Sequence, residues 1–208
     1  MVRTRRELSI FLSALKVFTR PNVRLEQYPS DGNTAGKLLW KAHLRGEMDN
    51  KTILDLGCGT GILGIGALLL GAKHVIFLDI DQKVQPLLEE NIAFLEEHYE
   101  VPGTWEFICQ DVRKLEVQQE DLIVISNPPF GTKIKHMDKV FLQQGLRVAP
   151  IMYSMHKTST KAFLEAFART EELLLDMEDV SFPLQNTMDK HKKRLERIEV
   201  TLVRYEKI

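Results

Sequence analysis

Residues 52–64 read TILDLGCGTGILG, and this stretch decides the fold. Its first five residues form a short apolar run, which is typical of a buried parallel strand. Glycines follow at positions 57, 59, 61 and 64, and residues 65–70 continue as an apolar helical stretch. Strand, glycine-rich loop and helix in this order suit a nucleotide-like ligand, because glycine permits a tight turn and close approach of the backbone. The stretch therefore predicts an α/β fold with a ligand at this strand–helix turn.

Further strands are expected on both sides of this loop. Apolar runs of strand length occur at residues 74–79, 105–109, 122–126 and 151–155. Their alternation with helical segments is the pattern of a doubly wound parallel sheet. Two late segments, 173–182 and 198–205, are expected to form a hairpin-like pair at one sheet edge. Because we find no repeat and no interdomain linker, we predict a single domain over residues 1–208.

Amphipathic patterns and capping residues predict the remaining helices. One helix is expected over residues 4–18, with its apolar side chains on one face. A second is expected to begin after Asp31 or Asn33, either of which can cap it, and to end at Trp40. Asp81 is expected to cap a third helix, and residues 160–169 are expected to form another.

Composition limits the class of protein. The chain is 44% hydrophobic, as globular proteins are, and it holds no run of 18 apolar residues that would predict a membrane span. Its basic N-terminus is not followed by the apolar core and cleavage site of a signal peptide. Cys58 and Cys109 lack paired spacing, and the six histidines lack metal-ligand spacing. We therefore expect reduced thiols, no metal and a cytoplasmic location, with the nucleus open if the source is eukaryotic.

The residues around the glycine loop favour a methyl donor over a dinucleotide. Asp79 lies 18 residues after Gly61, near the ~20-residue spacing of a carboxylate that holds ribose hydroxyls. Asp111 and Val112 follow the strand at 105–109, where an adenine edge could rest. Dinucleotide enzymes share the Gly59-x-Gly61 spacing, so the loop alone is a weak signal. Asp55 before the loop suits a positively charged amino group, and with the density of glycines it points to S-adenosylmethionine.

The second chemical motif is Asn127-Pro128-Pro129-Phe130, which follows the apolar run 122–126. Two prolines cannot continue a strand, so Asn127 is expected at a carboxyl strand end, where open α/β sheets bind ligands. Its side-chain oxygen can accept a hydrogen from an amino group, and Phe130 can lie against a flat ring. This is the site needed to methylate the exocyclic nitrogen of adenine, a motif for which a dehydrogenase has no use.

Basic residues are unevenly distributed although the net charge is −1. They gather in residues 1–24 and 188–197, and Lys133 and Lys135 follow the motif at 127–130. These groups suit contacts to phosphates, with solvated helix and loop faces as the alternative. His156 and Lys157 are expected just beyond a strand end, as an RNA contact or a surface loop. Tyr28 is expected either in the core or in the wall of a base pocket, whereas Met152, Met155 and Met177 are expected in the core.

Six short segments together resemble a known family. They are Leu25-Glu-Gln-Tyr-Pro-Ser30, Asp55-Leu-Gly-Cys-Gly-Thr-Gly61, Asp79-Ile-Asp81, Asn127-Pro-Pro-Phe-Gly-Thr-Lys133, Tyr153-Ser-Met-His-Lys157 and His191-Lys-Lys-Arg194. Over almost the whole chain, the sequence resembles the small archaeal and eukaryotic RNA methyltransferases typified by methyltransferase-like protein 5. The resemblance implies a Rossmann-like class I methyltransferase with a seven-stranded, mostly parallel sheet and helices on both faces. It also implies N6-methyladenosine in small-subunit ribosomal RNA and, for the eukaryotic members, a small zinc-binding activator subunit that forms a heterodimer.

The resemblance also assigns residues by position. In residues 1–50 it implies N-terminal helices and a loop in which Gln27 and Ser30 close over the donor, before a Rossmann-like core over 51–208. Gly57, Thr60 and Ile62 would line the methionine side of the donor site, beside Gly59 and Gly61 of the loop. Asp79 would hold the ribose, and Asp111 and Val112 the adenine. The tetrad at 127–130 would be catalytic. By their charge rather than by the resemblance, Lys133, Lys157, Lys192, Lys193 and Arg194 are expected to contact RNA. Lys190 stands where the family carries an aromatic residue, and Ser30 where threonine is commoner.

Three other functions stay open on the sequence alone. A protein methyltransferase that acts on the glutamine side-chain nitrogen would need nearly the same tetrad, more often with tyrosine in fourth place and with an added N-terminal helical domain. A DNA adenine-N6 methyltransferase usually carries a separate target-reading domain, for which the chain has no room. A non-catalytic RNA-binding module would not need both an intact glycine loop and an intact tetrad.

Overall fold

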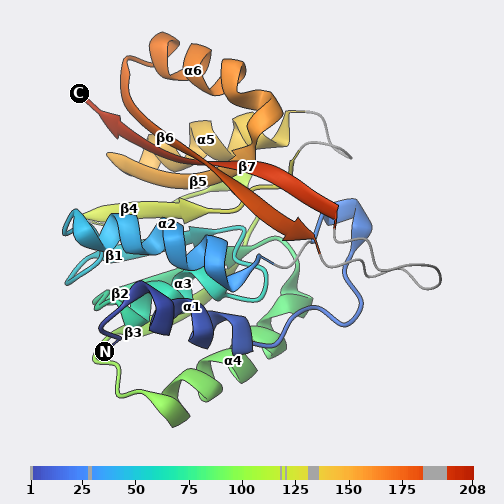
Figure 1. Ribbon diagram of the computed structural model, residues 1–208, viewed down its shortest axis with the longest axis vertical. Coiled ribbons are helices and arrows are strands. Elements are labelled where there is room, and N and C mark those ends of the chain that lie inside the picture. Colours follow the sequence, from blue (N-terminus) through green and yellow to red (C-terminus); the bar gives the residue numbers. More distant parts are fainter. Residues whose placement is uncertain (1, 28–29, 118, 120, 131–135, 185–195) are drawn as a thin grey trace.

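The fold is a seven-stranded sheet with helices on both faces, seen in a computed structural model (Figure 1). The structure describes residues 2–27, 30–117, 119, 121–130, 136–184 and 196–208. The strand order is β3-β2-β1-β4-β5-β7-β6. The strands are β1 (Thr52–Leu56), β2 (His74–Asp79), β3 (Thr104–Cys109), β4 (Leu122–Ser126), β5 (Ile151–Lys157), β6 (Leu173–Leu184) and β7 (Glu196–Lys207). The predicted α/β class and sheet are thus confirmed.

The parallel part of the sheet fixes the place of the site. β1 pairs in parallel with β2 on one side and with β4 on the other, with Thr52 opposite both His74 and Leu122. Strand order reverses between β1 and β4, since the chain builds outward first to β3 and then to β5. Ligands of open α/β sheets bind at such a switch point, at the carboxyl ends of the strands. The glycine loop after β1 and the tetrad after β4 therefore lie side by side.

Two hydrophobic cores cover the two faces of the sheet. The first contains residues of the first four α-helices, and the second contains residues of the last two. The α-helices are α1 (Arg5–Ala14), α2 (Gly32–Leu44), α3 (Ile62–Leu69), α4 (Gln85–His98), α5 (Met137–Val148) and α6 (Lys161–Thr170). Neighbouring strand residues alternate between the two cores, as in Ile53 and Leu54. This alternation is expected of a sheet that is covered on both faces.

Several helix limits differ from those predicted. α1 ends at Ala14 rather than residue 18, and α2, capped by Asp31 through a 2.9 Å bond from the Thr34 N–H, continues past Trp40. α3 begins at Ile62 rather than residue 65, because Gly61, with φ of 82°, ends the turn and serves as its N-cap. α5 (Met137–Val148) was not predicted as a separate helix. Beyond the end of α1 the apolar residues Leu15, Val17 and Phe18 continue, so the sequence pattern overruns the helix.

The close packing of α3 on the sheet depends on a glycine. A Cβ atom at Gly64 would lie 2.2 Å from Cε1 of Phe77 in β2. Only glycine lets the helix approach the strand this closely, which brings the backbone of the donor loop against β2. The glycine predicted to serve the ligand therefore also serves the packing of helix on strand.

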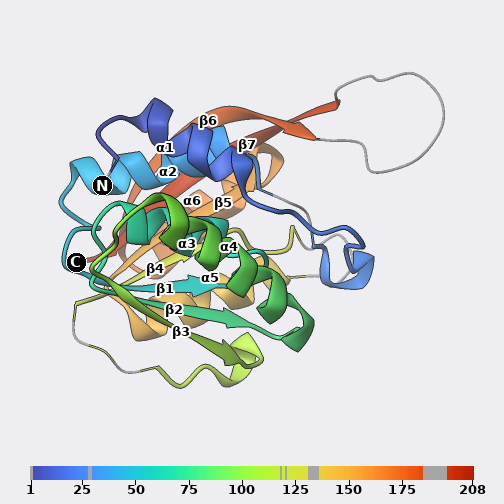
Figure 2. The ribbon, with the colours of Figure 1, turned by 90° about the horizontal axis from the view of Figure 1, so that it is seen from below.

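The predicted edge hairpin is confirmed as a long two-stranded ribbon. β7 pairs antiparallel with both β5 and β6, so β6 forms one edge of the described sheet and β3 the other. Figure 2 shows β6 and β7 running together as this ribbon. On the other edge, Thr104, Glu106 and Cys109 of β3 are exposed. In the part of the chain that the structure describes, no helix is long and apolar enough to cross a membrane.

Candidate active site

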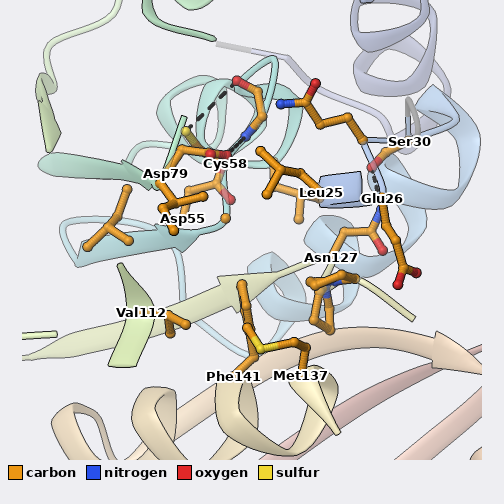
Figure 3. Close-up of a pocket in the computed structure, with 18 of the residues that line it drawn as sticks. Leu25, Glu26, Ser30, Asp55, Cys58, Asp79, Val112, Asn127, Met137 and Phe141 are labelled. Carbon is orange, nitrogen blue, oxygen red and sulfur yellow. Dashed lines mark hydrogen bonds between the residues drawn. The ribbon is translucent and has the colours of Figure 1, made fainter. Parts of the chain in front are cut away.

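A cavity of about 310 Å³ opens where β1 and β4 end (Figure 3). It is lined by most of the residues predicted for the donor and the tetrad. They are Gln27, Ser30, Asp55, Gly57, Gly59, Thr60, Ile62, Asp79, Asp111, Val112, Asn127, Pro128, Pro129, Phe130 and Lys157. Gly61 does not line the cavity and instead caps α3. Tyr28, Lys133, Lys192, Lys193 and Arg194 lie outside the described residues.

Sequence analysis missed several residues of the cavity wall. Phe18, Arg24, Leu25 and Glu26 belong to the segment between α1 and α2, which passes the carboxyl ends of the strands (blue in Figure 1). Met137 and Phe141 come from α5. A local motif gives no signal for them, because the chain brings them to the site only through tertiary packing.

The glycine loop presents its backbone to the cavity and to β2. Gly57 and Gly59 have φ of 74° and 53°, a region that side chains disfavour. The N–H groups of Gly57 and Cys58 donate to the Leu78 carbonyl at 2.8 and 3.0 Å. The loop is therefore held against β2 by main-chain bonds.

Asp79 at the end of β2 braces this loop. Its Oδ2 accepts the Gly59 N–H and its Oδ1 accepts the Asp81 N–H, both at 2.9 Å. Burial raises the pKa of Asp79, while these N–H groups oppose the rise. A carboxylate has about four acceptor positions, so capacity remains for the hydroxyls of a ribose.

Asp55 lies deeper, with 1% of its surface exposed. Its Oδ2 accepts the Gly64 N–H at 2.8 Å. Burial raises the pKa of Asp55 to about 7, the Gly64 N–H opposes the rise, and the Asp79 charge adds to it. An acid poised in this way gains most from a cationic partner, because two opposite charges relieve the penalty of burial that either alone would suffer.

The residues present fit S-adenosylmethionine. Two carboxylates stand near the ends of β1 and β2, where they would hold an ammonium group and ribose hydroxyls, and Val112 adds an apolar wall. A Cβ atom at Gly57 would lie 2.8 Å from Cε1 of Phe141, so the wall there has no room for a side chain on the loop. The Asp111 carboxylate is engaged by Arg113, which holds the pKa of Asp111 below its usual value. No group of three or more His, Cys, Asp or Glu suited to a metal occurs among the described residues.

The tetrad forms the opposite wall. The Ser126 hydroxyl donates to the Leu56 carbonyl at 2.7 Å and ties the end of β4 to β1. The next residue, Asn127, donates from Nδ2 to Ser30 Oγ at 2.9 Å (Figure 3), which leaves its side-chain oxygen as the remaining acceptor. Lys157 Nζ lies 5.3 Å from the centre of the Phe130 ring, within cation–π range. Amide, ring and cation thus gather at one side of the cavity.

The segment between α1 and α2 is anchored over the site, and we call residues 16–27 with Ser30 the N-terminal strap. Asn91 of α4, fully buried, accepts from the Lys16 N–H at 2.8 Å and donates to the carbonyls of Lys16 and Thr60. Gln27 Nε2 donates to Asp81 Oδ2 at 3.0 Å. Asn91 was not predicted as an anchor. In the sequence it is marked only as a polar residue on the apolar face of α4.

The expectation for His156 is wrong. β5 continues to Lys157, so His156 lies inside the strand with 1% of its surface exposed. Its Nε2 hydrogen-bonds the Ser154 hydroxyl at 2.8 Å, and burial lowers its pKa to about 3. A neutral, buried imidazole is neither an RNA contact nor a loop residue. Met152 and Met155 are buried as expected, whereas Met177 is half-buried.

The fold and the cavity define a class I methyltransferase that uses S-adenosylmethionine. The family model described as Conserved hypothetical protein 95 matches residues 39–174. The rRNA N(6)-adenosine-methyltransferase METTL5 of Danio rerio is 31% identical over 206 residues, 96% of this chain and 97% of the relative. The uncharacterised protein MJ0284 of Methanocaldococcus jannaschii is 33% identical over 98% of this chain and 94% of its own.

A solved structure gives the same result. The crystal structure of PH1948 from Pyrococcus horikoshii, described provisionally as an RNA methyltransferase, aligns with a TM-score of 0.87 and 36% identity over 98% of both chains. The chain belongs to the Conserved hypothetical protein 95 family and to the same family as these METTL5-like relatives. The resemblance inferred from six short segments is confirmed.

Proposed function

We propose that this enzyme methylates N6 of an unpaired or flipped adenine in structured RNA, with small-subunit ribosomal RNA as the substrate. The observation that carries the proposal is the orientation of Asn127, whose Nδ2 is bound to Ser30 so that its oxygen is the free end of the amide in the cavity. The zebrafish, fly and worm relatives are named rRNA N(6)-adenosine-methyltransferases, which supports N6 of adenosine in ribosomal RNA as the target.

The chemistry requires an acceptor beside a weak nucleophile. The lone pair of adenine N6 is delocalised into the ring. In our proposal the Asn127 side-chain oxygen and the Pro128 carbonyl each accept one N6 hydrogen, which favours a more tetrahedral nitrogen. S-adenosylmethionine, when bound, supplies a methyl group already activated on a sulfonium, so positioning accounts for most of the catalysis. Asp55 and Asp79 bind and orient, and the proton leaves to water.

Phe130 adds a stacking surface for the base. Base–aromatic stacking contributes ~1–3 kcal/mol and is available only to a base that has left its own stack. The ring is half-buried against the core and lies under the Lys157 ammonium. The target adenine must therefore be unpaired or flipped when it binds.

A partner subunit is part of the proposal. The resemblance implies that eukaryotic members need a small zinc-binding activator, and we extend this need to the present chain. β3 is an edge strand of the described sheet, and an open edge suits pairing with another chain. Full activity and solubility of the purified chain alone would count against an obligate partner.

The test is product identification. Purified protein, with and without co-expressed activator, is incubated with labelled S-adenosylmethionine and separately with small-subunit ribosomal RNA, genomic DNA and release-factor protein. Each product is then digested and the methylated residue identified, with the Asn127→Ala variant as background. N6-methyladenosine from the RNA is expected. Label in glutamine or in DNA would assign the tetrad to the protein-modifying or DNA-modifying class instead.

A further inference from the structure

We infer that Ser30 is a positioning residue for the methyl transfer, because its Oγ accepts from the Nδ2 end of the Asn127 amide and leaves the oxygen end for the target. Ser30 lies 97 residues before Asn127, and its Oγ receives the Asn127 Nδ2 hydrogen bond at 2.9 Å. Figure 3 shows the two side chains meeting among the residues that line the cavity. The inference deepens the proposed function and rests on it, since an amide orientation matters only if that amide binds the substrate.

The two ends of the amide have opposite chemistry. Oδ1 accepts hydrogen bonds, whereas Nδ2 carries two hydrogens and only donates. A target amino group has hydrogens to give, so it binds the oxygen end and is rejected by the nitrogen end. Within the described part of the chain, Ser30 is the partner that holds the Asn127 side chain. Loss of Ser30 therefore frees the amide to turn and to present the wrong end for part of the time.

Gln27, the last described residue before Ser30 in the strap, is itself anchored. Its side-chain amide donates to Asp81 Oδ2 at 3.0 Å and accepts the Asn22 N–H at 2.8 Å. Asp81 in turn lies two residues beyond Asp79, which braces the donor loop. The strap thus links the donor side of the cavity to the amide of the tetrad.

The hydroxyl of Ser30 also couples the amide to the contents of the cavity. A hydroxyl can donate as well as accept, so Ser30 selects one orientation of Asn127 only while its own proton is engaged elsewhere. Ser30 lines the cavity, where a bound ligand can take that proton. Binding of S-adenosylhomocysteine, the product left when the donor has lost its methyl group, should then restrict the Asn127 amide further.

The variants are Ser30→Ala, which removes the hydroxyl, and Ser30→Thr, which keeps it. Thr170→Ala is the matched control, because it removes a hydroxyl that donates to the Ala166 carbonyl at 3.0 Å on α6. On each variant we would measure the affinity for S-adenosylhomocysteine and the single-turnover methylation rate on small-subunit RNA at saturating donor. We would also record the ¹⁵N–¹H resonances of the Asn127 Nδ2 group, which are assigned by their absence in Asn127→Ala.

In Ser30→Ala we expect a single-turnover rate about tenfold lower at saturating donor, the effect of one lost hydrogen bond. Because this rate is measured at saturation, the loss is independent of any weaker binding of S-adenosylhomocysteine. The Asn127 resonances should shift in Ser30→Ala and not in Thr170→Ala, and Ser30→Thr should restore rate and resonances. A weaker affinity with an unchanged rate at saturation would overturn the inference and make Ser30 a donor contact only. If the wild-type enzyme methylates no RNA, the proposed function fails. Separately, unmoved Asn127 resonances in Ser30→Ala would show that the hydrogen bond between Ser30 and Asn127 is absent and would overturn the inference.

Discussion

The two sides of the cavity are built differently. On the donor side, carboxylates and main-chain N–H groups bind one another: Asp79 holds Gly59, and Asp55 holds Gly64. On the target side, side chains from distant parts of the chain meet: Asn127 with Ser30, and Phe130 with Lys157. Where main-chain groups form the site, a substitution that moves them also disturbs the fold. Where only side chains form the site, a substitution can remove a contact and leave the fold intact. Donor-side changes should therefore lower stability and donor affinity, and target-side changes should lower turnover alone.

The largest effect is expected on the target side. Asn127→Ala removes the acceptor proposed for the N6 hydrogens, and by analogy with loss of one transition-state hydrogen bond the methylation rate should fall on the order of 100-fold or more. The melting temperature should stay near that of the wild type, because neighbouring Ser126 still ties β4 to β1. Single-turnover kinetics and thermal unfolding measure the two quantities. A rate within threefold of the wild type would remove Asn127 from the mechanism.

On the donor side, Gly61→Ala should lower stability and donor affinity, whereas Asn127→Ala on the target side should lower the rate. Gly61 has φ of 82°, and an added Cβ would lie 2.3 Å from Cδ1 of Leu88. The disfavoured backbone region and the overpacking together should lower the free energy of unfolding by roughly 2–4 kcal/mol, and donor affinity should fall with it. Gly46→Ala is the control, since Gly46 has φ of 72° with nothing within 4 Å of the added atom. Urea titrations measure the free energy of unfolding of both variants. If both lose the same amount, backbone strain alone explains the loss and the contact with Leu88 contributes nothing.

Asp55 should make stability depend on pH. Its pKa in the folded protein is about 7, above the ordinary value of 3.8, so the folded state binds more protons between these values. The stability that protonated Asp55 contributes is fully present below pH 3.8 and is lost as the pH rises through about 7. Between pH 5.5 and 7.5 the loss should be roughly 2 kcal/mol, from about 1.4 kcal/mol per pH unit within the window. Asp55→Asn should flatten this slope in urea titrations, and an unchanged slope would contradict the assignment.

The smallest effect is expected at Lys157. Lys157→Met keeps the length of the side chain and removes the cation over Phe130, so kcat/KM for RNA should fall about two- to fivefold, the size of an exposed cation–π contact. Lys157→Arg should retain most of the activity. Kinetics at two salt concentrations separate this role from a phosphate contact, because only a phosphate contact would make the loss shrink strongly at high salt.

Local motifs were sufficient to predict that the glycine loop and Asp79 lie together at the cavity. The strand, glycine loop and acid at Asp79 lie within one strand–helix–strand unit, and the prolines after β4 end that strand wherever the rest of the chain lies. The same locality explains the correct hairpin of β6 and β7. The error at His156 came from the length of β5, because a polar residue at a buried position resembles the start of a loop.

The strap and its anchors could not be predicted in the same way. Asn91, Gln27 and Ser30 act through partners 75, 54 and 97 residues away in sequence. No periodicity or spacing encodes such a pair, and each contact exists only after the sheet has formed. The family resemblance placed Gln27 and Ser30 near the donor, but the contact between Ser30 and Asn127 required the structure.

The most direct test of the division between the two sides is the donor affinity of Asn127→Ala, measured by calorimetric titration with S-adenosylhomocysteine. If the donor side is complete without the tetrad, the Kd should lie within about threefold of the wild-type value while methylation is lost. A Kd weakened tenfold or more, in step with the loss of activity, would place Asn127 in the donor site and contradict the account.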